Sequence, residues 1–207
     1  MKPEHIAAED LAAWVRANAE NSTRFLLGIV GAPGSGKSTL TGPLAQELGA
    51  DVVPMDGFHL PNRELDRRDL RAVKGAPHTF DAEGFVDAIR DIRRADADVW
   101  LPDFDRVSDE PRPDRICVHE STSIVIVEGN YLLLESEPWG VLRDLFDVVA
   151  YLDVDASQRV ERLIERHVRF GKTPAAASHF VHESDEPNAA LVEAVRHRAH
   201  LIIESGR

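Results

Sequence analysis

Residues 31–38 read Gly31-Ala32-Pro33-Gly34-Ser35-Gly36-Lys37-Ser38 and fill every required position of the pattern G-x-x-x-x-G-K-[ST]. The apolar run at residues 25–30 precedes this stretch and is typical of a buried strand. From Ser38 onward, Leu40, Leu44 and Leu48 repeat with helical spacing. A strand, a glycine-rich loop and a helix in this order predict a loop that cradles phosphate groups.

The loop residues have the chemistry that such a cradle requires. Glycines let the backbone approach the ligand closely, so that backbone N–H groups point at phosphate oxygens beside a helix N-terminus. We expect Lys37 to reach the β- and γ-phosphates and the Ser38 hydroxyl to hold Mg²⁺. A glycine-rich turn without a ligand is the disfavoured alternative, because the motif is complete and correctly flanked. The expected nucleotide-binding residues of the loop are Gly31, Ala32, Gly34, Ser35, Gly36, Lys37, Ser38 and Thr39.

Composition limits the class of protein. A chain of 207 residues, 43% hydrophobic and 29% charged, predicts one globular domain over residues 1–207. Its longest apolar runs, at residues 25–30 and 124–127, are far shorter than the ~20 residues of a membrane helix. The N-terminal residues lack the layout of a signal peptide, so a cytoplasmic location is expected.

Charge and cysteine content exclude further classes. The net charge of −12 argues against nucleic acid as a partner, and any bound nucleotide requires locally concentrated cations. Cys117 is the single cysteine, which excludes an intrachain disulfide and a zinc site based on cysteines.

Hydrophobic periodicity predicts a three-layer α/β fold with a mostly parallel sheet of five strands. The strands are expected at residues 25–30, 51–55, 124–127, 148–152 and 201–203. Helices are expected at residues 4–19, from 38 onward, at 82–95 and at 157–169, with a further helix before residue 201. A short hairpin would pair residues 99–101 with 116–118, and residues 171–188 are expected to form an extended loop.

Two carboxylates follow predicted strands directly. Asp56 comes after the strand at 51–55, and Glu128 comes after the strand at 124–127. Ligands of open parallel sheets bind beyond the carboxyl ends of the strands. We therefore expect both carboxylates to face the phosphate-binding loop.

The loop by itself does not distinguish a kinase from a GTPase switch, an ABC-type ATPase or a metal-delivery NTPase. The chain has no N-K-x-D segment and no L-S-G-G-Q signature. Residues 81–84 match D-x-x-G, but they follow a loop and not an apolar strand, so chance explains the match better.

Four further blocks carry a family resemblance. They are Met55-Asp56-Gly57-Phe58-His59-Leu60-Pro61-Asn62, Lys74-Gly75-Ala76-Pro77-His78-Thr79-Phe80-Asp81, Pro102-Asp103-Phe104-Asp105-Arg106 and Val127-Glu128-Gly129-Asn130-Tyr131. Together they resemble the P-loop kinases around uridine kinase, phosphoribulokinase and type I pantothenate kinase, and most of all the fructose transport system kinase-like proteins. The resemblance implies the P-loop nucleoside triphosphate hydrolase fold with a helical lid, and the use of ATP and Mg²⁺.

The resemblance also implies roles for individual residues. Asp56 would be the general base toward the acceptor hydroxyl, with Lys37 and Arg166 as the other catalytic residues. The alternatives for Asp56 are that it caps the following helix or binds a Mg²⁺ water. Glu128 occupies the Walker B position, so the metal residues would be Ser38 and Glu128.

Four arginines of the helix at 157–169 lie broadly on one face. They are either solvated and paired, for example with Glu165, or part of a lid over the triphosphate at about residues 162–188. We favour the lid for Arg166, and then for Arg162 or Arg169. The lid pattern of uridine kinase, R-D and then R-G-R, becomes Arg166-His167 and Phe170-Gly171-Lys172 here.

The resemblance places an acceptor pocket in the segment of about 57–118 and its neighbours. Its expected residues are His59, Asn62, Lys74, His78, Asp81, Asp105, Arg106 and Tyr131. The expected acceptor is a small molecule with a hydroxyl group, a sugar such as fructose, with pantothenate and nucleosides as alternatives.

An NTP-hydrolysing switch or chaperone-like module is the alternative function from another class, and a nucleotide-binding regulator with a decayed acceptor site is the third possible function. The oligomeric state stays open, with a homodimer among the alternatives.

Overall fold

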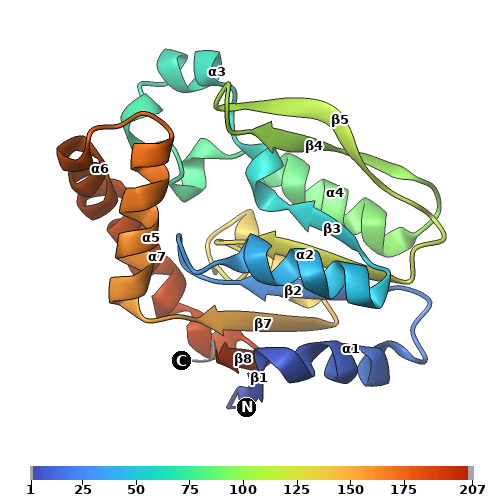
Figure 1. The fold of residues 1–207 in the computed structure, drawn as a ribbon. Helices are drawn as coiled ribbons and strands as arrows, with labels where there is room; N and C mark the ends of the chain where they lie inside the picture. Colours follow the sequence, from blue (N-terminus) through green and yellow to red (C-terminus); the bar gives the residue numbers. More distant parts are fainter. Residues whose placement is uncertain (1, 205–207) are drawn as a thin grey trace.

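The computed structural model describes residues 2–204 and has a parallel sheet at its centre (Figure 1). Six strands follow one another in the order β1-β8-β7-β2-β6-β3. Their bounds are β1 Glu4–Ala7, β2 Phe25–Val30, β3 Asp51–Pro54, β6 Ile124–Gly129, β7 Val148–Asp153 and β8 Leu201–Glu204. The expected α/β class and parallel sheet are confirmed, but the sheet has six strands and not five.

The additional strand is β1, at one edge of the sheet. A single helix was expected over residues 4–19, whereas the chain forms β1, a 3₁₀ turn at Ala8–Asp10 and helix α1 at Leu11–Ala19. β1 pairs in parallel with β8, and the Glu4 N–H donates to the His200 carbonyl at 2.9 Å. The partner lies almost 200 residues away, so local periodicity could not reveal the pairing.

Helices cover both faces of the sheet, as three layers require. Along β2, Phe25, Leu27 and Ile29 pack with α1 and with α2 (Lys37–Leu48). The alternate residues Leu26 and Val30 face the opposite core, which contains α4 (Ala82–Arg94). This alternation follows from the period of two in a strand, and burial on both faces explains why β2 and β6 are apolar throughout.

A two-stranded antiparallel ribbon, β4 (Val99–Asp105) and β5 (Glu110–Val118), projects toward the same side as the carboxyl ends of the sheet strands (Figure 1). It is longer than the expected hairpin, because the segment 102–113 continues both strands despite its prolines. A ribbon of two strands has a free edge on each side. Proline lacks an N–H group, and no ladder hydrogen bond is lost where that position faces the free edge. Short helix α3 (Asn62–Arg67) and 3₁₀ turns at Met55–Phe58, Arg71–Val73 and Pro77–Thr79 complete this part.

The C-terminal region forms α5 (Ala156–Arg169), α6 (Pro174–Phe180), a π-helical turn (Val181–Asp185) and α7 (Glu186–Ala194). The prediction of an extended loop at 171–188 was wrong. Thr173 caps α6 by accepting from the Ala176 N–H at 3.2 Å, and Pro174 occupies its first turn. α5 and α6 lie beyond the carboxyl ends of the strands (Figure 1). Among residues 2–204, none of the helices combines the length and the apolar character needed to cross a membrane.

Candidate active site

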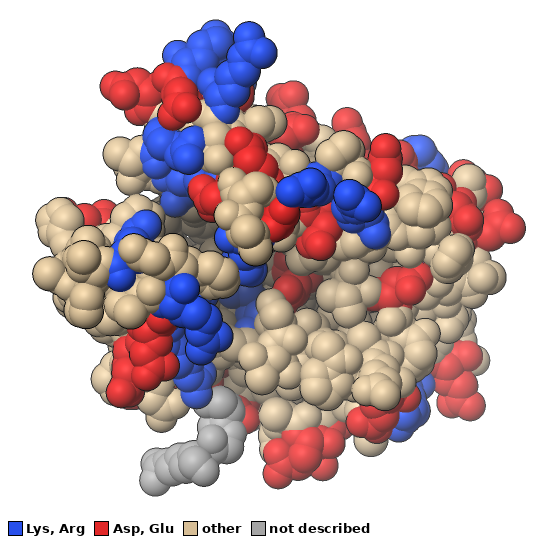
Figure 2. All heavy atoms as spheres, turned by 45° about the horizontal axis from the view of Figure 1, so that its top comes forward, with Lys and Arg blue, Asp and Glu red and all other residues tan. Residues whose placement is uncertain are grey.

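A cleft of about 770 Å³ lies where the loop at 31–38, the turn between β4 and β5 and the helices α5 to α7 meet. Figure 2 shows Lys and Arg side chains gathered in and around a hollow on this face. The cleft is lined by seven cationic residues and four carboxylates, although the chain carries a net charge of −12. The expected local concentration of cations is therefore present. The cations are Lys37, Arg71, Lys74, Arg106, Arg162, Arg166 and Lys172.

The glycine-rich loop packs tightly against α5. Gly34 has φ +77°, and a Cβ atom there would lie 2.8 Å from the Arg159 carbonyl oxygen and from Leu163. A larger residue would therefore separate the loop from the helix. The Arg159 guanidinium donates to the Pro33 carbonyl at 3.2 Å and to Glu186 at 3.1 Å. These contacts fix the loop between α5 and α7.

Lys37 points into the cleft from the first residue of α2. Its ammonium donates to the Gly31 carbonyl at 2.8 Å and to Asn130 Oδ1 at 2.7 Å. Burial lowers the pKa of Lys37 to about 8, although the nearby carboxylates of Glu128 and Asp56 favour its charged form. The ammonium can therefore lose its proton within a pH range accessible to experiment.

Ser38 and Glu128 bring two hard oxygen donors together. The Ser38 hydroxyl donates to Glu128 Oε1 at 2.7 Å, and Thr41 donates to Oε2 at 3.4 Å. Burial raises the pKa of Glu128, and these hydrogen bonds with the charge of Lys37 only partly offset this effect. A hydroxyl and a carboxylate beside a phosphate-binding loop are donors that Mg²⁺ accepts, so these residues fit the expected metal.

Asp56 follows β3 in the 3₁₀ turn Met55–Phe58 and lines the cleft with about a third of its side chain exposed. Arg106 donates to Asp56 Oδ2 at 2.8 Å. Burial raises the pKa of Asp56, but the charges of His59, Arg106 and Lys37 outweigh it and hold the pKa below its usual value. The carboxylate is therefore ionised at neutral pH and engaged by an arginine.

The ribbon is held close to Asp56 by a close backbone approach. A Cβ atom on Gly57 would lie 2.2 Å from the Pro102 carbonyl oxygen, so only glycine fits there. This contact brings Phe104 and Arg106 of the ribbon to the cleft. Arg106 is thus presented to Asp56 by backbone packing.

His59 and its aromatic neighbours form the adjoining wall of the cleft. The His59 ring lies 4.0 Å from Phe80 and 4.8 Å from Phe104, measured between ring centroids. Its Nδ1 lies 2.8 Å from the Asp56 carbonyl oxygen. Burial lowers the pKa of His59 despite the nearby Asp56 carboxylate.

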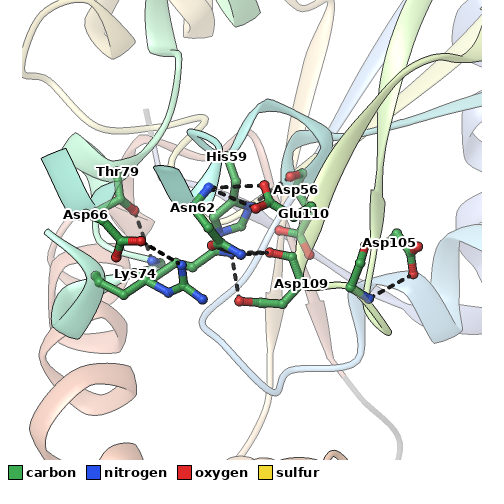
Figure 3. Close-up of polar contacts among 12 residues, drawn as sticks. Asp56, His59, Asn62, Asp66, Lys74, Thr79, Asp105, Asp109 and Glu110 are labelled. Carbon is green, nitrogen blue, oxygen red and sulfur yellow. Dashed lines mark hydrogen bonds and ion pairs between the residues drawn. The ribbon is translucent and has the colours of Figure 1, made fainter. Parts of the chain in front are cut away.

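Lys74 and Asn62 meet at Asp109, in the turn of the ribbon (Figure 3). Lys74 donates to Asn62 Oδ1 at 2.7 Å and to Asp109 Oδ2 at 2.8 Å. The Asn62 amide donates to the Asp109 carbonyl at 2.9 Å. Lys74 and Asp109 line the cleft, whereas Asn62 stands behind them and holds the turn.

Besides Asn62, four expected acceptor residues and one expected lid residue do not line the cleft. Tyr131 is fully buried, and its hydroxyl donates to the Gly75 carbonyl at 2.5 Å. Asp81 caps α4 by accepting from the Gly84 N–H at 3.0 Å, and Asp105 accepts from the Val107 N–H at 2.9 Å within the ribbon turn. Each of these polar groups is already satisfied by backbone.

His78 and Arg169 are the other two, and both are exposed outside the cleft. Arg162 and Arg166 do line it, from the middle of α5. Arg169 is the last residue of that helix and is not among the lining residues, although the following Phe170 and Lys172 line the cleft.

Several cleft residues were not expected from the sequence. Asn130 accepts a hydrogen bond from Lys37. It follows the Glu-Gly pair that ends β6, and this place directly after a strand was a sequence signal that could have identified it. His167 Nε2 lies 2.8 Å from Asp185 Oδ2, and both residues are mostly buried. Their separation in sequence left no local signal. Lys172, between α5 and α6, and Asn188 of α7 also line the cleft.

Several known proteins are similar to this chain. No protein-family model matches the chain. A candidate uridine kinase of Schizosaccharomyces pombe is 39% identical over 188 residues, which cover 84% of this chain and 80% of that protein. The ATP-dependent kinase YFH7 of Saccharomyces cerevisiae is 30% identical over 159 residues, which cover 59% of this chain and 45% of that protein.

A solved structure is also similar over nearly the full length. The crystal structure of a candidate fructose transport system kinase from Silicibacter sp. TM1040 is 38% identical, with a TM-score of 0.85. The match covers 95% of this chain and 98% of that one. The family resemblance expected from the sequence is confirmed. The chain therefore belongs to the P-loop kinases related to uridine kinase and is an ATP-dependent phosphotransferase.

Proposed function

We propose that this protein transfers the γ-phosphoryl group of ATP to a hydroxyl group of a sugar-like small molecule. In this proposal Asp56 is the general base, and Mg²⁺ is required. The supporting observation is that the Asp56 carboxylate and the Lys37 ammonium line one cleft, close enough for each charge to shift the pKa of the other. An acceptor base and a phosphate-binding cation thus face the same reacting group.

The nucleotide side of the cleft supplies position and charge. The loop N–H groups and Lys37 bind the phosphates, while Arg162 and Arg166 neutralise charge from the lid. The Ser38 hydroxyl and the Glu128 carboxylate would hold Mg²⁺, which neutralises phosphate charge when it is bound. Phosphoryl transfer depends mostly on such positioning and charge neutralisation.

On the acceptor side, Asp56 holds the proton of the attacking hydroxyl. Arg106 keeps the Asp56 carboxylate ionised and fixes one of its oxygens, which leaves the other available to the acceptor. Proton removal makes the acceptor oxygen a better nucleophile. About a third of the Asp56 side chain is exposed, so an acceptor in the cleft can reach the carboxylate.

The acceptor wall favours a molecule with several hydroxyl groups. His59, Lys74 and Asp109 place a ring, a cation and a carboxylate on the same side of the cleft. Paired donors and acceptors of this kind discriminate strongly, because a ligand without matching groups leaves them unpaired. The relatives named as a uridine kinase and a fructose transport system kinase agree with a ribose-like or hexose acceptor. Fructose is our first choice, with nucleosides and pantothenate as alternatives.

Release of ADP in the presence of different acceptors tests the proposal. The purified protein with ATP and Mg²⁺ is offered fructose, other sugars, nucleosides and pantothenate in a coupled assay. We expect one class of small alcohol to stimulate ADP release, and Lys37→Ala to abolish productive nucleotide binding. Slow hydrolysis that no acceptor stimulates and that a protein partner accelerates would instead indicate a switch or chaperone-like module. We propose neither nucleic acid nor membrane as a partner, in line with the net charge.

A further inference from the structure

A cluster of three different side chains lies at the end of the ribbon opposite its turn. Asp98 immediately precedes β4, whereas Cys117 and His119 stand at the end of β5 and just after it. Val99 pairs with Val118, which sets Asp98 opposite His119 across the ladder. Residues 117 and 119 are two apart on an extended chain, so their side chains point to the same side. The ladder therefore gathers a carboxylate, a thiol and an imidazole.

Two of the three distances within this cluster match those of a tetrahedral metal site. Cys117 Sγ lies 3.7 Å from His119 Nδ1, and His119 Nδ1 lies 3.3 Å from Asp98 Oδ2. The ligand atoms of the three residues all lie within 4.8 Å of one another. Tetrahedral Zn²⁺ with its usual bond lengths would separate sulfur and nitrogen by ~3.6 Å, and nitrogen and oxygen by ~3.3 Å. Little movement is needed for the three atoms to share one ion.

The neighbours of the cluster hold its carboxylate in position. The Glu120 N–H donates to Asp98 Oδ1 at 2.9 Å, which leaves Oδ2 for the side of His119 and Cys117. Asp51 lies close by, where it accepts from the Thr122 hydroxyl at 2.6 Å and adds negative charge. Partners that orient a ligand in this way raise the metal affinity of natural sites. The His119 side chain is 60% exposed, so solvent can reach a fourth position.

We propose that Asp98, Cys117 and His119 form a surface site for a divalent transition-metal ion, Zn²⁺ in particular, with water as the fourth ligand. Sulfur and nitrogen ligands select zinc over magnesium, whereas Ser38 and Glu128 offer only oxygen. The single cysteine excluded a zinc site based on cysteines, but His119 adds an imidazole from the same end of β5 and Asp98 adds a carboxylate from the start of β4. The ion joins the start of β4 to the end of β5, and so stabilises the ribbon that carries Arg106 at its other end.

Zinc titration of the full-length protein tests this proposal. Protein freed of metal with a chelator, which is then removed, competes for Zn²⁺ with a chromophoric chelator. We expect one tight Zn²⁺ per chain in the wild type, independent of ATP. Cys117→Ser and His119→Gln each weaken that binding by ~10- to 100-fold or more, because even outer-shell changes have effects of this size.

His5→Gln is the matched control. His5 also pairs with a carboxylate, Glu204, at 2.8 Å and is 60% exposed, but no thiol lies in that pair. Its zinc affinity should equal that of the wild type. Co²⁺ gives an independent readout, since a thiolate-to-metal charge-transfer band should appear in the wild type and disappear in Cys117→Ser. Circular dichroism checks that the variants fold.

Two results would overturn the proposal. One is a zinc affinity of the wild type that is no higher than that of Cys117→Ser and His119→Gln. The cluster would then be an ion pair of His119 and Asp98 beside a thiol that binds no metal. The other is a Co²⁺ spectrum without a thiolate band. Neither result depends on the identity of the phosphoryl acceptor.

Discussion

Replacing Asp56 by asparagine isolates the charge of the proposed general base. Asparagine has nearly the same shape, and its carbonyl oxygen can still accept from Arg106, which lies 2.8 Å from the carboxylate in this structure. The amide cannot take a proton from the acceptor hydroxyl. The packing of the cleft is preserved, so a change in rate reports on proton acceptance and charge.

The expected loss follows from the size of general base catalysis. We expect kcat to fall by ~10² to 10⁴, equivalent to about 3 to 5 kcal/mol in the activation free energy. Nucleotide affinity should persist, because the loop and Lys37 do not depend on Asp56 for their hydrogen bonds. Removing a negative charge near the phosphates should, if anything, tighten ATP binding.

Steady-state ADP release gives kcat with a saturating acceptor, and isothermal titration gives the Kd for an ATP analogue. Asp81→Asn is the matched control, because Asp81 is an exposed carboxylate that caps α4 outside the cleft. Asparagine caps a helix about as well as aspartate, so neither stability nor kcat should change in that variant.

Retention of activity in Asp56→Asn would refute the reasoning. If kcat stays within about threefold of the wild-type value, a change below ~1 kcal/mol, Asp56 is not the base. If ATP affinity is lost together with kcat, Asp56 acts in nucleotide binding instead.

Three further predictions concern the charges and hydrogen bonds around the cleft. Arg106→Gln should move the acid limb of kcat/KM to higher pH, because one of the charges that lower the Asp56 pKa is removed while burial still raises it. An unmoved limb in the pH profile contradicts this. The affinity of the wild-type protein for ATP should fall as the pH rises past about 8, because Lys37 then loses its proton. The fall should be at most about tenfold per pH unit. Calorimetry of Lys37→Met should show weak ATP binding that does not depend on pH in this range. Tyr131→Phe should lower the free energy of unfolding, measured in urea, by ~1 kcal/mol, because the buried hydroxyl no longer donates to the Gly75 carbonyl. The KM for the acceptor should stay the same. An increased KM would show that Tyr131 contributes to acceptor binding.

The sequence by itself predicted the central sheet and the phosphate-binding loop. Burial on both faces makes β2 and β6 continuously apolar, and the loop motif carries its own glycines, lysine and serine. The predicted helix at 82–95 was also confirmed, by α4. These features depend on residues close in sequence, so a local pattern contains the information.

Sequence reasoning was weaker where a polar residue had two local uses. Asp81, Asp105 and Tyr131 stand in blocks that resemble an acceptor site, yet backbone groups already engage their side chains. Their residue types suit substrate binding and structural capping equally well. Only the positions of the neighbouring N–H and carbonyl groups distinguish the two.

The tertiary structure alone decided the contacts between distant segments. β1 is a strand because β8 offers it a free edge, and Arg159 is a loop anchor because α5 packs onto Gly34. Arg106 reaches Asp56 from the turn of the ribbon, and Asp98 meets Cys117 and His119 across its other end. Such pairings depend on how the chain closes over long separations in sequence, and the free energy that selects them comes from packing and hydrogen bonds between elements that no local pattern records.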